Sequence, residues 1–66
     1  MPQASDELRK RWGIAPEKAL RVLRGRFDID NGLIRPKPAV FVQDEEYSAI
    51  DFLCDEWDYA YDPRPL

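Results

Sequence analysis

The side chains that could act as nucleophiles are few, and none has the basic partner that this chemistry needs. The chain holds one cysteine, Cys54, two serines, Ser5 and Ser48, and no histidine. A catalytic serine or cysteine is activated by an adjacent general base, most often histidine. Paired carboxylates could hydrolyse a glycoside, but a 66-residue chain has no room for a cleft that excludes water from a sugar. We therefore expect a protein that is not an enzyme.

The carboxylates do not form a metal-binding motif either. Residues 28–32, Asp-Ile-Asp-Asn-Gly, begin like an EF-hand calcium loop, in which glycine stands sixth and glutamate twelfth. Counted from Asp28, however, glycine is the fifth residue and the twelfth is Ala39. A zinc cage of cysteine and histidine is not expected, because the chain offers a single thiol. We expect no metal and no cofactor, and we interpret Asn31-Gly32 as the turn of a β-hairpin.

Charge is divided unevenly along the chain. Residues 1–26 hold seven Lys/Arg and three Asp/Glu, a balance of +4, whereas residues 27–66 hold three and ten, a balance of −7. No Lys or Arg lies between Lys37 and Arg64. Acidic residues crowd the C-terminal half of the last predicted helix, where the helix dipole disfavours each anion by about 0.3–1 kcal/mol. We therefore expect these carboxylates to interact with a basic surface, which belongs either to the N-terminal half of this chain or to a partner protein.

Two aromatic residues indicate that the basic surface belongs to a partner protein. Phe52 and Tyr59 lie seven residues apart and fall in the acidic sector of the helical wheel, away from the apolar stripe. Aromatic residues ringed by charge are typical of a protein interface. The alternative is that Phe52 packs under the hairpin or the first helix. We predict a protein-binding module, an inhibitor or adaptor, that docks on a basic partner surface through Asp51, Phe52, Asp55, Glu56, Asp58 and Tyr59.

The basic half supports a second hypothesis, the binding of nucleic acid. Two short helices followed by a hairpin would have the order of a helix-turn-helix with a wing. The chain's net charge of −3 opposes attraction to phosphate, and the cations could instead be solvated or pair with the acidic half. The residues that would contact nucleic acid are Lys18, Arg21, Arg24 and Arg26.

A third hypothesis is a structural homodimer. A chain of this length buries only about 60% of its unfolded surface. A disulfide within the chain is not available to stabilise it, because Cys54 is the only cysteine. Self-association would bury additional surface, so we keep a homodimer as an alternative.

The elements that must position these residues are marked by local signals. Ser5 is a suitable N-cap for a helix that ends at Gly13. Pro16 suits the start of a second helix, which ends near Gly25. Apolar and acidic residues at helical spacing predict a longer amphipathic helix over 44–61, with Cys54 on its apolar side.

β-prone residues flank the Asn31-Gly32 turn, with Phe27 and Ile29 on one face of the hairpin. Pro36 and Pro38 oppose a central strand, and residues 40–42 form either a third strand or the lead-in to the last helix. We predict an α+β mini-domain made of two short N-terminal helices, this hairpin and the C-terminal helix. We expect residues 1–66 to form one small domain, with flexible tails at 1–4 and 62–66.

Composition also gives an expectation for the compartment. No stretch approaches the ~20 apolar residues that span a bilayer, and the N-terminal residues lack the apolar core of a signal peptide. A lone cysteine fits a reducing environment. We therefore expect a cytoplasmic protein without a membrane partner.

The short length, the local acidity and the segment 53–61, Leu-Cys-Asp-Glu-Trp-Asp-Tyr-Ala-Tyr, give the chain a resemblance to a group of known proteins. It resembles small acidic accessory proteins of phages and prophages, which include anti-CRISPR proteins and other host-takeover inhibitors. The resemblance implies binding to a host protein, in some cases by an acidic surface that takes the place of nucleic acid. It assigns no role to a particular residue.

Overall fold

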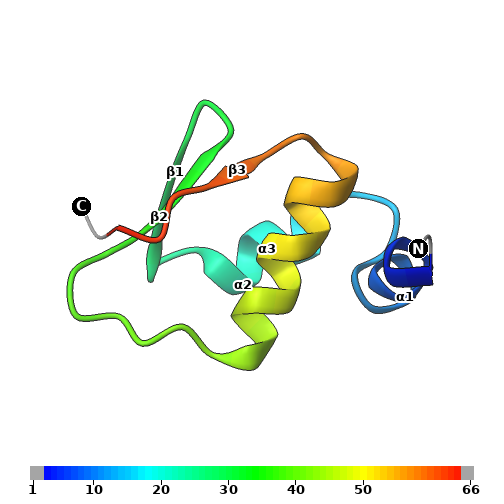
Figure 1. Ribbon diagram of the computed structural model, residues 1–66, viewed down its shortest axis with the longest axis horizontal. Helices are drawn as coiled ribbons and strands as arrows, with labels where there is room; N and C mark the ends of the chain where they lie inside the picture. Colours follow the sequence, from blue (N-terminus) through cyan, green and yellow to red (C-terminus); the bar gives the residue numbers. More distant parts are fainter. Residues whose placement is uncertain (1–2, 65–66) are drawn as a thin grey trace.

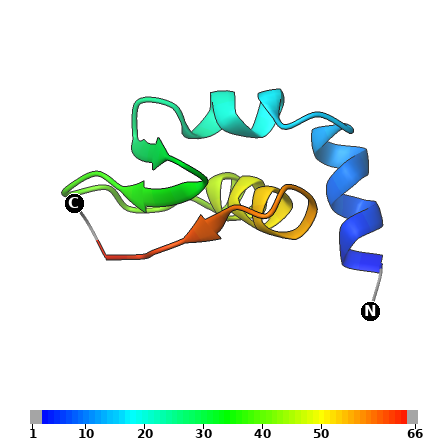
Figure 2. The same cartoon turned by 90° about the horizontal axis from the view of Figure 1, so that it is seen from above.

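Three helices and a small three-stranded sheet make up the fold, which confirms the predicted α+β class. The computed structural model describes residues 3–64. The helix α3 packs against α1, α2 and β3, with α1 at one end of the molecule and the sheet at the other (Figures 1 and 2). The elements in chain order are α1 (Gln3–Trp12), α2 (Glu17–Leu23), β1 (Phe27–Asp30), β2 (Leu33–Pro36), α3 (Asp44–Glu56) and β3 (Ala60–Tyr61).

The two N-terminal helices end at the predicted glycines, but the first begins earlier than expected. Helix α1 starts at Gln3, so Ser5 lies inside it and is not its N-cap, and Gln3 and Ala4 are helical. Gly13 has a φ of +87° and its N–H donates to the Arg9 carbonyl at 2.7 Å. A left-handed residue at this position is the usual way for a helix to end. Residues 1 and 2 of the expected tail lie outside the described part of the chain.

The hairpin has the predicted turn and the predicted face. Asn31 and Gly32 both have positive φ, 54° and 79°, as a type I′ turn requires. The antiparallel register pairs Ile29 with Ile34 and Asp30 with Leu33. Phe27 is buried while the aspartates of β1 are exposed, so one face of the hairpin joins the core.

The expectation that Pro36 opposes a central strand is wrong. Strand β2 is central in the order β1-β2-β3, and Pro36 is its last residue. Strand β3 pairs in parallel with Leu33 and Ile34 only, so Pro36 lies beyond the doubly paired part of β2. Because proline has no N–H to donate, the pairing with the last strand ends before Pro36. Residues 40–42 form no strand and lead into α3.

The last helix is shorter than predicted. Helix α3 ends at Glu56, and Asp58 adopts a left-handed conformation with a φ of 58°. The chain then reverses, the Tyr59 N–H donates to the Leu53 carbonyl at 3.2 Å, and residues 60 and 61 join the sheet as β3. The Asp62 N–H donates to the Ile34 carbonyl at 2.9 Å, which extends the pairing into the segment expected to be a tail. Residues 65 and 66 lie outside the described residues.

The hydrophobic core lies where α3 meets the other elements. The Trp12 indole is 2% exposed, and its Nε1–H donates to Ser48 Oγ at 3.0 Å, so the buried polar atom is satisfied. The partly buried Ser48 hydroxyl therefore supplies the hydrogen-bond acceptor for a core residue. The buried apolar residues are Trp12, Ala19, Leu23, Phe27, Ile34, Ala49, Ile50, Phe52 and Leu53.

Candidate functional site

The predicted acidic-aromatic face does not exist as a single surface. Phe52 is 0% exposed, so the prediction that it anchors a partner is wrong and the alternative, that it packs inside, is correct. The physical reason is that α1 and α2 both pack against α3. A helix with two such neighbours buries a wider sector than the single apolar stripe that a helical wheel assigns to the core.

The other residues of that face are dispersed. Glu56 pairs with Arg9, whose Nη2 lies 2.9 Å from Glu56 Oε1, so this carboxylate is neutralised by the same chain. Tyr59 is half-buried against α2 and β1, whereas Asp51 and Asp55 lie along the groove between α1 and α3. Asp51, Asp55 and Asp58 are exposed. The six residues therefore cannot dock together on one partner surface.

The alternative basic set is also divided. Arg26 donates from Nε to Glu46 Oε2 at 2.6 Å and from Nη2 to the Phe41 carbonyl at 2.8 Å, so it holds the chain together and is not available as predicted. Lys18 Nζ donates to the Arg11 carbonyl at 3.1 Å. Arg21 of α2 and Arg24, the C-cap of this helix, are exposed and line one shallow depression. Only these two retain the geometry expected of an open basic surface.

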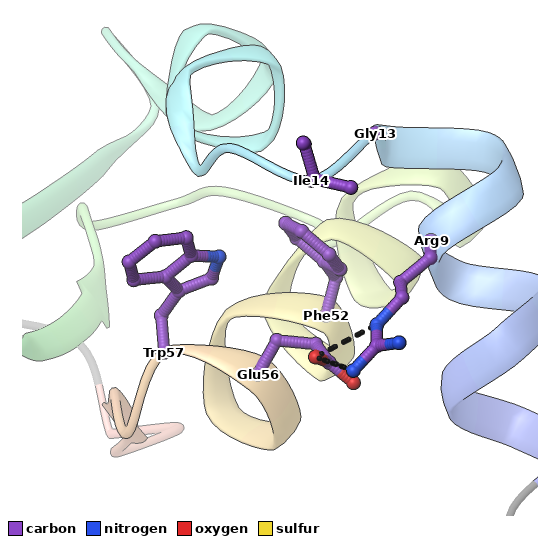
Figure 3. A pocket seen from close by; sticks show the side chains of 6 residues that line it. All are labelled: Arg9, Gly13, Ile14, Phe52, Glu56 and Trp57. Carbon is purple, nitrogen blue, oxygen red and sulfur yellow. Dashed lines mark hydrogen bonds and ion pairs between the residues drawn. The ribbon is translucent and has the colours of Figure 1, made fainter.

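A hollow between the C-terminal ends of α1 and α3 is a candidate site. We call it the Ile14–Trp57 hollow; its volume is about 160 Å³. Figure 3 shows Ile14 above the Phe52 ring, with Trp57 to one side and the Arg9–Glu56 ion pair to the other. The hollow is lined by Arg9, Gly13, Ile14, Phe52, Glu56 and Trp57.

Two exposed apolar side chains form the rim of this hollow. Gly13 ends α1 in a conformation that side chains disfavour, and the chain then leads out to Ile14, which is 86% exposed. Trp57 is the C-cap of α3 and is 42% exposed. Ile14 and Trp57 line different sides of the same hollow (Figure 3), and exposed apolar side chains gathered at one surface site often mark interaction sites.

Sequence reasoning missed both rim residues, for identifiable reasons. Ile14 falls in the short link between two predicted helices, where periodicity assigns no face. Trp57 falls on the apolar side of the helix predicted over residues 44–61, so the helical pattern assigns it to the core. The sequence did contain one signal for this site. Ile14 is a large aliphatic residue that directly follows the glycine ending a helix, and the apolar periodicity of neither helix accounts for it.

The remaining chemistry-bearing groups lie outside the hollow. Cys54 is half-buried, and burial, with contributions from Asp51 and Asp55, raises the pKa of its thiol. Hydrogen bonds from Arg64 lower the pKa of Asp62 to about 2. Among residues 3–64, no cluster of three or more Asp, Glu, Cys or His side chains is arranged to hold a metal ion. No helix in this part of the chain combines the length and apolarity needed to cross a membrane.

The fold and the site define a small α+β domain that presents an apolar hollow between two helix ends. A family model described as "Phage Pam3 gp59 related protein" matches residues 1–65. The chain therefore belongs to this family, and the phage part of the resemblance is confirmed. No curated protein and no solved structure matches the chain.

Proposed function

We propose that this phage-related chain is a non-enzymatic protein-binding module, an inhibitor or adaptor, that contacts its partner through the Ile14–Trp57 hollow. The observation that carries the proposal is the 86% exposure of Ile14 beside Trp57. Fully burying an isoleucine side chain against a partner contributes about 1.5–3 kcal/mol. Tryptophan is among the residues that most often dominate the energy of protein interfaces.

The size of the hollow supports a protein partner over a small molecule. Small-molecule sites usually enclose about 300–1,000 Å³, whereas this hollow measures about 160 Å³. A side chain projecting from a partner surface would fill it. That side chain would contact Ile14 and Trp57 at the rim and lie beside the Arg9–Glu56 pair, above the buried Phe52.

Charge beside Trp57 favours a partner with a basic rim on that side, whereas Arg9, Lys10 and Arg11 in the last turn of α1 give the opposite side of the hollow a positive charge. Asp58 is exposed directly after Trp57, and the C-terminal end of α3 adds the negative pole of the helix dipole. Lys or Arg side chains of the partner, placed around the apolar side chain that enters the hollow, would be attracted by this negative charge. The attraction would raise the association rate and make that rate depend on salt concentration. If the partner's basic surface normally binds DNA or RNA, this chain would compete with the nucleic acid for that surface.

The test uses the exposed side chains, which can be changed without disturbing the core. Tagged wild-type chain and the Ile14→Asp variant are used to capture proteins from host lysate, with captured species identified by mass spectrometry. The matched control is Phe41→Asp, since Phe41 is 84% exposed and does not line the hollow. We expect the specific partner to be lost with Ile14→Asp and retained with Phe41→Asp. Equal capture by all three proteins would refute the hollow as the contact site.

Binding of nucleic acid is the second candidate, favoured by one observation. Arg21 and Arg24 are exposed, and neither forms an ion pair with any side chain that the structure describes. A gel shift with generic duplex DNA at increasing salt tests this candidate. Binding that weakens steeply with salt and disappears in Arg21→Ala/Arg24→Ala would rank nucleic acid above protein. A purely structural homodimer would instead show a dimeric mass by light scattering and no heterologous partner.

A further inference from the structure

A second groove lies between α2 and the hairpin, away from the hollow. It is lined by Leu20 of α2, Arg24 at the C-cap of α2, Phe27 and Ile29 of β1, and Tyr59, and its volume is about 340 Å³. We call it the α2–β1 groove. It shares no residue with the Ile14–Trp57 hollow, so the two surfaces can be tested independently.

The α2–β1 groove has apolar surface that is only partly covered, next to the polar groups of Arg24 and Tyr59. Leu20, Ile29 and Tyr59 are half-buried and pack against the core from outside. They therefore expose apolar surface on the inner side of the sheet, next to β1, which is an edge strand. Side chains of an extended segment laid along this groove would contact all three.

Arg24 is the charged residue among those that line the groove. Arg24 is exposed and forms no ion pair within the part of the chain that the structure describes, in contrast to Arg26 two residues later. Asp28 and Asp30 alternate with Phe27 and Ile29 along β1 and therefore point to the opposite face of the sheet. The carboxylates of β1 do not neutralise the guanidinium.

We propose that the α2–β1 groove binds an acidic, apolar peptide segment of another protein. Apolar side chains of the segment would fill the groove, and a carboxylate would pair with Arg24. A two-fold dimer through this groove is disfavoured, because such an interface brings the same patch of both copies together and the groove lining holds no carboxylate to pair with Arg24. With the hollow as a separate contact surface, the chain would be an adaptor with two binding faces.

The test is a titration of the ¹⁵N-labelled chain with short synthetic peptides, followed by NMR. One peptide alternates leucine with aspartate, and the matched peptide alternates leucine with lysine. We expect the amide signals of Leu20, Ile29 and Tyr59 to shift with the aspartate peptide, and its affinity to exceed that of the lysine peptide. Shifts of equal size with both peptides, or none with either, would refute the proposal.

Charge reversal supplies the second half of the test. We expect Arg24→Glu to weaken the aspartate peptide at least threefold, since a pair at an exposed rim contributes up to about 1 kcal/mol. Lys37→Glu changes net charge by the same amount at an exposed site outside the groove and should leave the affinity unchanged. Equal weakening by both variants would show a nonspecific charge effect and overturn the proposal. Binding of single-stranded DNA at these amides, or a dimer that occludes them, would also overturn it.

Discussion

Arg26 Nε lies 2.6 Å from Oε2 of Glu46, and this pair joins the start of the hairpin to the first turn of α3. Glu46 is 5% exposed, and its Oε1 also accepts the Gln43 N–H at 2.8 Å in a capping box. The same arginine donates to the Phe41 carbonyl, so one side chain fixes the lead-in to the helix as well as its first turn. A residue that the charge pattern assigned to nucleic-acid binding is in fact part of the framework.

The first prediction concerns this pair. We expect Arg26→Ala to lower the free energy of unfolding by about 1–3 kcal/mol, because it leaves the buried Glu46 carboxylate without its cation. Arg24→Ala is the matched control: Arg24 is exposed and makes no ion pair within the described residues, so its loss should change stability by less than about 0.5 kcal/mol. Urea denaturation followed by circular dichroism measures both. Equal effects would contradict the structural role of Arg26.

The second prediction concerns the end of α3. Asp58 has a φ of 58°, and glycine adopts this conformation without the steric cost that a Cβ imposes. We expect Asp58→Gly to raise the free energy of unfolding by about 0.5–1 kcal/mol. Asp55→Gly, the same change inside the helix, should lower it by a fraction of a kcal/mol, since glycine is a poorer helix former than aspartate. Thermal denaturation of both variants distinguishes the left-handed position from the helical one.

The third prediction concerns the reactivity of Cys54. Burial and the carboxylates of Asp51 and Asp55 raise the pKa of its thiol, so the thiolate fraction at neutral pH is small and alkylation should be slow. We expect the midpoint of the pH–rate profile with iodoacetamide to lie above that of the urea-unfolded chain. Asp51→Asn should lower the midpoint, because it removes one of the two acidic neighbours. Asp44→Asn, at the other end of α3, should leave it unchanged.

The fourth prediction concerns pH and the C-terminal segment. Arg64 donates to both carboxylate oxygens of Asp62 at 3.1 Å and lowers its pKa to about 2. Asp62 in the unfolded chain titrates near its ordinary value of about 3.9. The folded-state pKa is the lower one, so the stabilisation is present above pH ~4 and is lost as pH falls through about 2. Carboxyl-carbon NMR should show a midpoint near 2 in the wild type, and Arg64→Ala should raise it.

Local signals in the sequence predicted most of the elements. Asn31-Gly32 specifies its turn because both residues tolerate positive φ, and Gly13 ends α1 for the same reason. Alternation along β1 correctly placed Phe27 inside and Asp28 outside. These outcomes depend on interactions within a few residues, which a single sequence displays directly.

The errors arose where distant parts of the chain meet. The prediction extended α3 to residue 61, but residues 60 and 61 instead pair with β2, which lies far away in the sequence. The helical wheel predicted that Phe52 is exposed. In the structure Phe52 is buried, because α1 and α2 together cover a wider sector of α3 than its single apolar stripe. Neither contact has a local sequence signal, because both depend on how the elements pack.

By itself the sequence determined the fold class, the hairpin and the uneven division of charge, since these follow from backbone preferences and side-chain types. The tertiary structure decided which charges remain available. It pairs Arg9 with Glu56 and Arg26 with Glu46, and leaves Arg24 at the rim of an apolar groove. It also holds Ile14 beside Trp57, residues 43 positions apart in the chain, at one hollow. The physical reason is that an ion pair or an apolar patch is a property of distance in space, and only packing brings these side chains together.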